Sequence, residues 1–298
     1  MSLSPFLSKI KSGQILISDG ATGTNLQTRG LPIGVTAENW VLENPAEIER
    51  LQRKFVEAGS DIILTCTFGA TPLRLEHTGM AGKTEEVNRA AVAIARNATA
   101  GTNTLVAGSI GPTGLMMEPM GELTPDAARR SFTEQARILA DAGVDFFVVE
   151  TQFDLAEAEA AVLGIREVSN LPLVVSFSYD RGKRTMMGVK PAQAGELLLR
   201  LGVDVAGINC GRSLDDNLAA MQELCATVNL PIWFKPNAGL PQVAADGSLS
   251  YTISPEMMGA DAKRWMDEGA VVIGGCCGNS PAHIRQIAQT AKAYQPGI

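Results

Sequence analysis

The sequence lacks the features that would direct it to a membrane or to nucleic acid. Its 298 residues contain no Lys/Arg run longer than two and carry a formal net charge of −7. No apolar run approaches the roughly 18 residues that a membrane span requires. We therefore expect neither nucleic acid nor a membrane as partner. The first residues, MSLSPFLSKIKSGQ, lack the basic start and apolar core of a signal peptide, so we expect a cytoplasmic location.

Histidine and cysteine are both scarce. The two histidines are expected to be solvated, His77 in a polar loop and His283 on a surface helix. Five cysteines without a signal peptide favour free thiols or metal ligands over a disulfide framework. Cys276 and Cys277 are adjacent and poorly placed for a mutual disulfide. Neighbouring α-carbons lie about 3.8 Å apart, whereas disulfides prefer roughly 4.4–6.8 Å.

Nucleotide-binding fingerprints are also missing. GATGTN, after the first expected strand, does not match GxGxxG. AGKT at residues 81–84 is not a P-loop, because His77 stands where that motif requires glycine. Both absences argue against an open, doubly wound nucleotide-binding sheet.

The sequence does contain a regular alternation of strand and helix patterns. Eight apolar, β-branched runs alternate with eight amphipathic segments, which predicts an α/β fold of the (β/α)8 TIM-barrel type. We expect one domain over residues 1–298, with a core of about residues 13–293. The expected strands are Ile15–Ser18, Asp61–Thr65, Thr104–Gly108, Phe146–Val149, Leu173–Ser178, Val205–Asn209, Ile232–Lys235 and Val271–Gly274. The expected helices are Pro45–Ala58, Thr84–Ala100, Thr124–Ala142, Leu155–Val168, Pro191–Leu201, Leu214–Thr227, Pro255–Glu268 and Pro281–Ala293.

Three cysteines fall at the C-terminal ends of expected strands, where TIM barrels carry their chemistry. Cys210 follows strand six, and Cys276 and Cys277 follow strand eight. Three thiolates that meet at one mouth form a zinc set whose fourth position is open to water or substrate. By contrast, Cys66 and Cys225 are expected to pack as small apolar side chains.

Charged residues follow other strands at the same expected mouth. Asp19 and Glu150 could be metal ligands, an acid/base pair or anchors for a cationic group of a substrate. The alternatives are a turn residue for Asp19 and a helix-start carboxylate for Glu150. Lys235 also ends an expected strand, and a lysine at this position could form a Schiff base, as in an aldolase. That hypothesis leaves the cysteines unexplained, and a solvated or salt-bridged lysine is commoner.

Five segments resemble, in order and spacing, the homocysteine S-methyltransferase family. They are SDGATGTNLQTRG, FVVETQFD, GINCGRS, PNAGLP and IGGCCGNSPAHI. The match is most similar to the homocysteine-binding zinc barrel of cobalamin-dependent methionine synthases. It implies a barrel distorted around one Zn²⁺ on Cys210, Cys276 and Cys277, and L-homocysteine as the methyl acceptor that becomes methionine. The resemblance also implies that Asp19 and Glu150 hold the amino-acid end of the substrate.

The expected substrate-binding set extends beyond these two carboxylates, with backbone amides around residues 20–24 as donors to a carboxylate. The full set is Asp19, Gly20, Thr22, Thr24, Ser109, Glu150 and Asn209. We expect no catalytic side chain beyond the metal-activated substrate thiolate.

The source of the methyl group is open at this stage. Methionine synthases carry folate, cobalamin and reactivation modules after this barrel, and we find no such module and no Asp-x-His-x-x-Gly corrinoid motif. We therefore expect no bound cobalamin or folate and an external donor. GINCGRS and PNAGLP resemble the corrinoid-dependent branch of the family, which favours a methyl-corrinoid protein over an S-methylmethionine- or betaine-type molecule. Aromatic residues (5%) are also few for a betaine cage.

Two alternative functions remain. One is methyl transfer or demethylation with another thiol or methylated donor in one-carbon metabolism. The other is a non-catalytic zinc- or thiol-binding subunit of a methyl-transfer complex.

Overall fold

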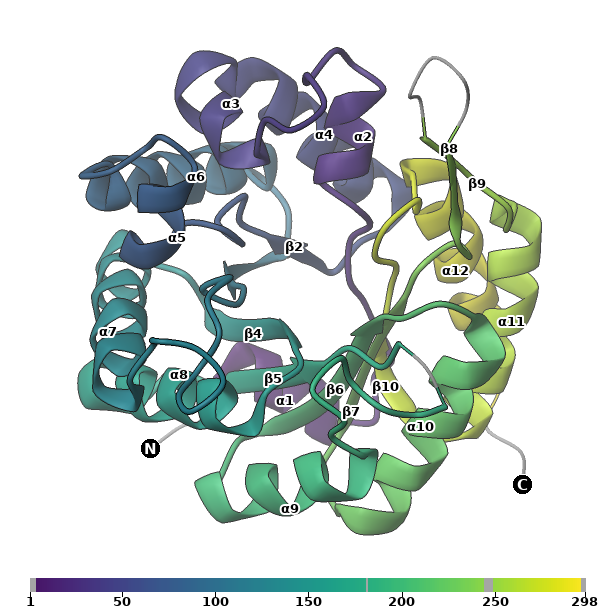
Figure 1. The fold of residues 1–298 in the computed structure, drawn as a ribbon. Helices are drawn as coiled ribbons and strands as arrows, with labels where there is room; N and C mark the ends of the chain where they lie inside the picture. Colours follow the sequence, from purple (N-terminus) through teal and green to yellow (C-terminus); the bar gives the residue numbers. More distant parts are fainter. Residues whose placement is uncertain (1–3, 181, 244–248, 296–298) are drawn as a thin grey trace.

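Eight parallel strands surround a central axis, and helices cover them on the outside (Figure 1). The computed structural model describes residues 4–180, 182–243 and 249–295. The strands follow the order β1-β10-β7-β6-β5-β4-β3-β2. A parallel bridge between Ser18 and Ile62 joins the two end strands and completes the barrel. The predicted TIM-barrel fold is therefore confirmed.

The eight barrel strands agree closely with the predicted ones. They are β1 (Leu16–Ile17), β2 (Ile62–Leu64), β3 (Leu105–Ile110), β4 (Phe146–Gln152), β5 (Leu173–Phe177), β6 (Val205–Cys210), β7 (Ile232–Pro236) and β10 (Ala270–Ile273). An antiparallel hairpin, β8 (Pro241–Val243) with β9 (Leu249–Tyr251), follows β7 and was not predicted. The register is irregular between β10 and β7 and between β4 and β5. The second irregularity lies between Val149 and Gln152, beside Glu150, whereas the first lies between Ala270 and Val272, at the start of β10.

All eight predicted helices are present. They are α4 (Pro45–Ala58), α6 (Thr84–Ala98), α7 (Pro125–Ala142), α8 (Leu155–Val168), α9 (Pro191–Leu201), α10 (Leu214–Thr227), α11 (Pro255–Asp267) and α12 (Pro281–Ala293). Four short helices were not predicted, namely α1 (Pro5–Lys11), α2 (Gly23–Gln27), α3 (Ala37–Glu43) and α5 (Pro72–His77). None of the helices in the described ranges is long and apolar enough to cross a membrane.

Local sequence signals explain where the long helices begin and end. Thr124 accepts a hydrogen bond from the Ala127 amide, and proline occupies the first turn of α7. At the other end of α4 and α7, Gly59 and Gly143 adopt the left-handed conformation that ends a helix at little steric cost. The chain then enters the next strand within a few residues.

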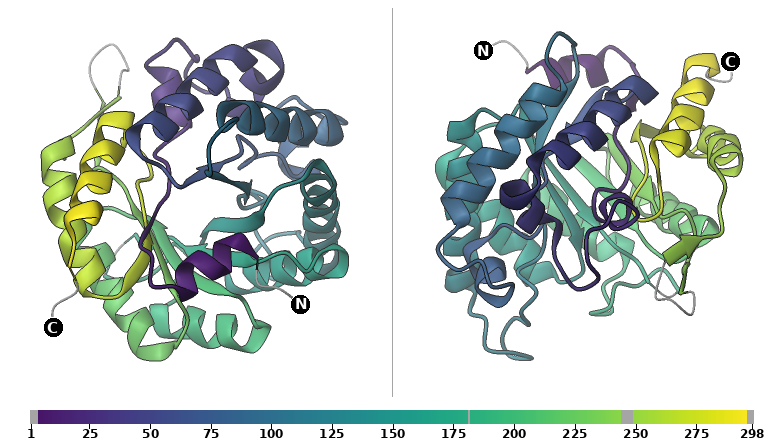
Figure 2. Two further views of the ribbon diagram at one scale, coloured as in Figure 1. Left: turned by 180° about the vertical axis from the view of Figure 1, so that it is seen from behind. Right: turned by 90° about the horizontal axis from the view of Figure 1, so that it is seen from above.

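The interior of the barrel is an apolar core of its own. Inward-facing side chains such as Phe146, Val148 and Trp233 pack together there, separately from the larger core between strands and helices. Helix α1 lies across the N-terminal end of the barrel (Figure 2). Its Phe6 is fully buried and stacks on Phe146, with 3.9 Å between the ring centroids. One end of the barrel is thereby sealed, and the other end is free to hold a site.

Candidate metal and substrate site

The three cysteines predicted as metal ligands meet at the C-terminal end of the barrel. Strands β6, β7 and β10 are neighbours in the sheet, so the end of β6 and the turn after β10 lie close together. The Sγ atoms of Cys210, Cys276 and Cys277 all lie within 4.8 Å of one another. Those of Cys210 and Cys276 are 2.9 Å apart. One metal ion can therefore contact all three sulfur atoms.

The backbone around the cysteines is unusual. Cys210 has a φ of 59°, a conformation that non-glycine residues seldom adopt. The turn after β10 is crowded, since a Cβ at Gly275 would lie 2.2 Å from the side chain of Asn279. That side chain donates hydrogen bonds to the carbonyls of Pro236 (3.0 Å) and Cys276 (3.1 Å). Asn279 thus holds the double-cysteine corner against β7, a role that the sequence analysis missed.

The donor set fits the predicted zinc ion. Hydrogen bonds to the Cys276 and Cys277 sulfur atoms, together with burial, raise the pKa of the Cys210 thiol. Three thiolates at this distance therefore need a cation to offset their charge. Thiolate ligands suit Zn²⁺, and their number corresponds to an open rather than a closed site. The two histidines lie elsewhere, and the described residues hold no other cluster of potential metal ligands of this kind.

The cysteines line a cavity of about 470 Å³. Several of the predicted substrate-binding residues share its wall, and these are Gly20, Thr22, Thr24, Ser109 and Glu150. Lys235, Thr151, Cys66 and Arg74 also line the cavity. The other two predicted residues, Asp19 and Asn209, are buried next to the cavity but do not form its wall.

Glu150 is held at the end of β4 by its neighbour on β3. The Ser109 hydroxyl donates a 2.6 Å hydrogen bond to the Glu150 carboxylate. Burial raises the pKa of Glu150 to about 7, against the opposing effect of the Lys235 charge. A carboxylate in this setting gains from a cationic partner, because burial penalises its ionised form. The wall of the cavity therefore offers a place for a small ammonium group.

Asp19 and Lys235 form a buried ion pair. The Lys235 ammonium donates a 2.7 Å hydrogen bond to Asp19 Oδ1, and the Leu64 amide donates one of 2.9 Å to Oδ2. Both side chains are at most 3% exposed. Burial lowers the pKa of Lys235, but the hydrogen bond to Asp19 and the nearby negative charges, those of Asp19 and Glu150 first, together outweigh this effect, and the net shift is upward. A lysine held as an ammonium is a poor amine nucleophile, which argues against the aldolase hypothesis.

Asn209 connects the ends of β4, β5 and β6. Its Oδ1 accepts hydrogen bonds from the Thr151 amide (2.8 Å) and the Ser176 hydroxyl (2.7 Å). Its Nδ2 donates to Thr151 Oγ1 at 2.7 Å and lies 3.4 Å from Cys210 Sγ. Like Cys210, Thr151 has a positive φ, of 60°. Asn209 therefore holds two unfavourable backbone conformations beside the sulfur cluster.

The loop after β1 is fixed to the loop after β10. Thr24 Oγ1 accepts a 3.2 Å hydrogen bond from the Gly278 amide, and the Ala21 amide donates to the Asn279 carbonyl at 3.0 Å. Glycine is required at Gly20, where a Cβ would lie 2.4 Å from that same carbonyl. These contacts bring the segment 20–24 to the rim of the cavity.

The structure corrects one expectation and refines others. His283 is not solvated, because it is 9% exposed and its Nε2 lies 3.0 Å from the Ile253 carbonyl. His77 is exposed as predicted, but it ends α5 rather than lying in a loop. Cys66 is buried in the core as predicted, although it also borders the cavity. Cys225 is partly buried against the core.

Comparison with known proteins assigns the class of this chain. Residues 16–291 match the family model described as homocysteine S-methyltransferase. The chain therefore belongs to the homocysteine S-methyltransferase family, a family of methyltransferase enzymes, as its motifs predicted.

Individual relatives agree with this assignment. The chain is 30% identical to methionine synthase of Mycobacterium leprae over 95% of its own length, and 30% identical to that of Mycobacterium tuberculosis over 94%. It spans 25% of the length of each of these curated relatives. Among solved structures, the metallated form of the homocysteine methyltransferase MmuM from Escherichia coli is similar, with a TM-score of 0.80 and 26% identity. That match covers 96% of this chain and 99% of MmuM.

Proposed function

We propose that this protein transfers a methyl group from an external donor to the thiol of L-homocysteine and so forms methionine. The observation that carries the proposal is the three-sulfur cluster of Cys210, Cys276 and Cys277, which opens into a cavity with charged groups on its wall. Family membership and the relatives named above support the same reaction. We also retain a cytoplasmic location as part of this proposal.

Each part of the site has a role in this reaction. When bound to the three cysteines, Zn²⁺ would keep the acceptor sulfur deprotonated, and a thiolate is the nucleophilic form of a thiol. Glu150, held by Ser109, binds and orients the acceptor's charged end. The loop 20–24 limits the position of the acceptor from the other side. In the transfer, the sulfur forms a bond to the methyl carbon while the carbon's bond to the donor breaks, and that electron pair leaves with the donor.

The donor is the open part of the proposal. A methyl-corrinoid protein remains the favoured source, with a sulfonium or ammonium compound such as S-methylmethionine or betaine as the alternative. A single panel of assays separates them. Zinc-loaded protein and L-homocysteine are incubated with methylcobalamin, S-methylmethionine or betaine, and methionine is quantified by mass spectrometry.

The expected result is methionine formation with one of the three donors. A matched control is Cys225→Ala, which leaves the sulfur cluster intact, against Cys277→Ala, which removes one of its members. Stoichiometric zinc without turnover from any of the three donors would support a non-catalytic zinc-binding role. Turnover with a different thiol only would replace homocysteine as the acceptor.

A further inference from the structure

Two side chains on the wall of the cavity carry opposite charges and lie on different sides of the barrel. Glu150 follows β4 and Lys235 lies near the end of β7, with β5 and β6 between these strands in the sheet. Both line the same cavity as the three cysteines. Glu150, Lys235 and Cys276 are close enough to interact electrostatically. A small zwitterion in this cavity would therefore meet one anion and one cation.

Asp19 is not available to a ligand in the same way. Oδ1 accepts the Lys235 ammonium at 2.7 Å and the Ser18 hydroxyl at 3.3 Å, and Oδ2 accepts the Leu64 amide at 2.9 Å. Asp19 is 1% exposed and does not belong to the cavity wall. Lys235 thus lies between the Asp19 carboxylate and the cavity. At this part of the wall, a substrate therefore contacts a positive charge rather than a negative one.

Lys235 has hydrogen-bonding capacity to spare. An ammonium group has three donors, and one acceptor for them is present among the described residues, Asp19 Oδ1. Lys235 is 2% exposed, so bulk water does not readily supply the others. The Trp233 ring, whose centroid lies 5.7 Å from Nζ, stabilises the charge without accepting a conventional hydrogen bond. A buried donor without an acceptor is costly, and an anionic ligand in the cavity would remove that cost.

We propose that Lys235 is a specificity-determining residue that binds the carboxylate of the acceptor, while Glu150 binds its ammonium group. The inference deepens the proposed function and rests on it for the class of acceptor. Asp19 then acts as a positioning residue, because it fixes the lysine rather than touching the substrate. The site selects a thiol that is also an α-amino acid, because Lys235 binds its carboxylate and Glu150 binds its ammonium group.

The competitors for this role are the backbone amides of residues 20–24, which Lys235→Met leaves in place, and a second cation on the wall, Arg74. Arg74 interacts electrostatically with Glu157, which is buried and accepts hydrogen bonds from Thr113. Lys235, by contrast, pairs in register with Asn209 on β6, the residue directly before Cys210, and so lies at the end of the cavity where the sulfur must bind. The carboxylate of a short thiol acid bound at the cysteines is therefore assigned to Lys235.

Calorimetry with three thiols tests the assignment without any methyl donor. The probes are L-homocysteine, 4-mercaptobutyrate, which lacks the ammonium, and 3-aminopropane-1-thiol, which lacks the carboxylate. For zinc-loaded Lys235→Met we expect roughly 10- to 100-fold weaker binding of the two carboxylate-bearing thiols. Binding of 3-aminopropane-1-thiol should change by less than about threefold. Glu150→Gln should show the reverse preference.

Two further variants keep the test decisive. Lys235→Met leaves Asp19 buried without its partner, so the double variant Asp19→Asn/Lys235→Met removes both charges and should show the same loss of carboxylate recognition. Arg74→Met is the matched control and should leave discrimination among the three thiols unchanged. Wild-type-like binding of 4-mercaptobutyrate by the double variant would overturn the proposal. An equal loss for all three thiols, or loss of carboxylate recognition in Arg74→Met alone, would also overturn it.

The binding assay separates this inference from the proposed function. Protein that shows the expected binding pattern but forms no methionine with any donor would refute the function and retain the role of Lys235. Protein that methylates homocysteine, yet binds the three thiols equally well before and after removal of the Lys235 charge, would do the opposite.

Discussion

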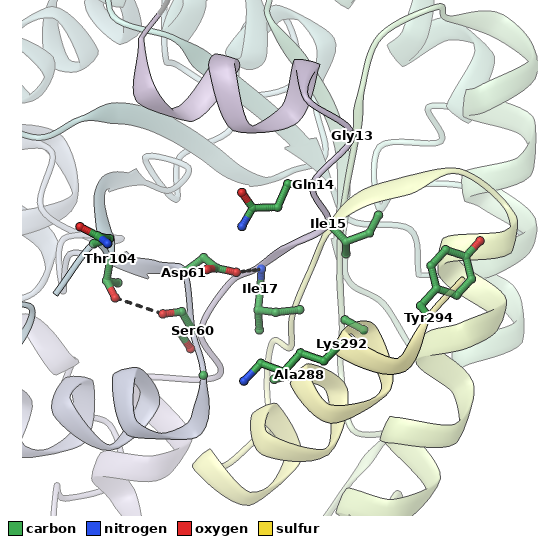
Figure 3. A pocket seen from close by; sticks show the side chains of 13 residues that line it. Gly13, Gln14, Ile15, Ile17, Ser60, Asp61, Thr104, Ala288, Lys292 and Tyr294 are labelled. Atoms are coloured by element: carbon green, nitrogen blue, oxygen red, sulfur yellow. Dashed lines mark hydrogen bonds between the residues drawn. The ribbon is translucent and has the colours of Figure 1, made fainter. Parts of the chain in front are cut away.

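The two ends of this barrel differ in what their polar groups are free to do. At the C-terminal end, the cysteines, Glu150 and Lys235 line a cavity of about 470 Å³. At the N-terminal end, the segments that lead into β1, β2 and β3 line a larger groove of about 590 Å³ together with the last turns of α12 (Figure 3). Two of its polar side chains bind the chain itself, since Asp61 accepts the Ile17 amide at 2.9 Å and Thr104 donates to the Ser60 carbonyl at 3.2 Å. Buried charges facing a cavity, rather than its size, distinguish the site.

The backbone differs between the two ends as well. Where helices return to strands at the N-terminal end, glycines such as Gly59 and Gly143 take the left-handed conformation at little cost. At the C-terminal end, glycines such as Gly211 and Gly278 adopt positive φ as well, but so do Thr151 and Cys210, and each of these two costs of order 1–3 kcal/mol. The backbone at the N-terminal end therefore favours stability. At the C-terminal end, an unfavourable backbone conformation at Cys210 reduces stability but positions a sulfur ligand.

Removal of one sulfur atom should have the largest effect on this contrast. Cys210→Ala, Cys276→Ala and Cys277→Ala should each lose stoichiometric zinc, because two thiolates hold Zn²⁺ far less well than three. Metal content by elemental analysis measures this after gel filtration. Cys225→Ala is the control and should keep its zinc. Full zinc retention by any of the three variants would contradict the three-thiolate site.

The sulfur ligands were predictable from the sequence because their signal is local. A cysteine directly after a strand faces the C-terminal mouth of a barrel, so the strand pattern placed Cys210, Cys276 and Cys277 together before any coordinates. Glu150 was placed at the cavity by the same rule. The eight barrel strands followed from the alternation of strand and helix patterns, whereas the hairpin of β8 and β9 did not.

Other parts of the site depend on contacts between distant residues, which no local pattern encodes. Asp19 and Lys235 are 216 positions apart and pair because β1 and β7 lie near each other in the closed barrel. In the sequence, Asp19 and Lys235 are two separate candidates, and no local pattern indicates that they form one buried ion pair. Helix α1 was missed because its seven residues carry only two buried side chains, too few for a helical pattern.

Loss of the plug at the N-terminal end should reduce stability without affecting the metal. Phe6 is fully buried against Phe146, and Phe6→Ala should lower the free energy of unfolding by about 3–5 kcal/mol. Chemical denaturation measures the change, and Lys11→Ala, at an exposed position of the same helix, is the control. Zinc content should match the wild type. A variant with normal stability, or with reduced zinc, would mean that the two ends are not independent.

Glu150→Gln should show that the ionised Glu150 at the C-terminal end lowers the stability of the protein at alkaline pH. The folded-state pKa of Glu150 is raised to about 7, whereas an unfolded glutamate titrates near about 4.3. The contribution of the protonated carboxyl to stability is therefore complete below the unfolded pKa and is lost as the pH rises through 7. Metal-free Glu150→Gln, which has no such titration, should be more stable than the wild type by roughly 1–3 kcal/mol at pH 8. The difference should shrink towards pH 4.5, and a difference independent of pH would contradict the assigned shift.

A change in the N-terminal groove should have the smallest effect of all. Lys292 lies on the wall of that groove and is exposed (Figure 3), so Lys292→Ala should alter the free energy of unfolding by no more than about 0.5 kcal/mol. Zinc content and the dissociation constant for L-homocysteine should equal those of the wild type, because the apolar interior of the barrel separates the two ends. Lys235→Met, a lysine change at the other end, provides the contrast in the same calorimetric assay. If Lys292→Ala weakened homocysteine binding as much as Lys235→Met does, the N-terminal groove would have to be counted as part of the site.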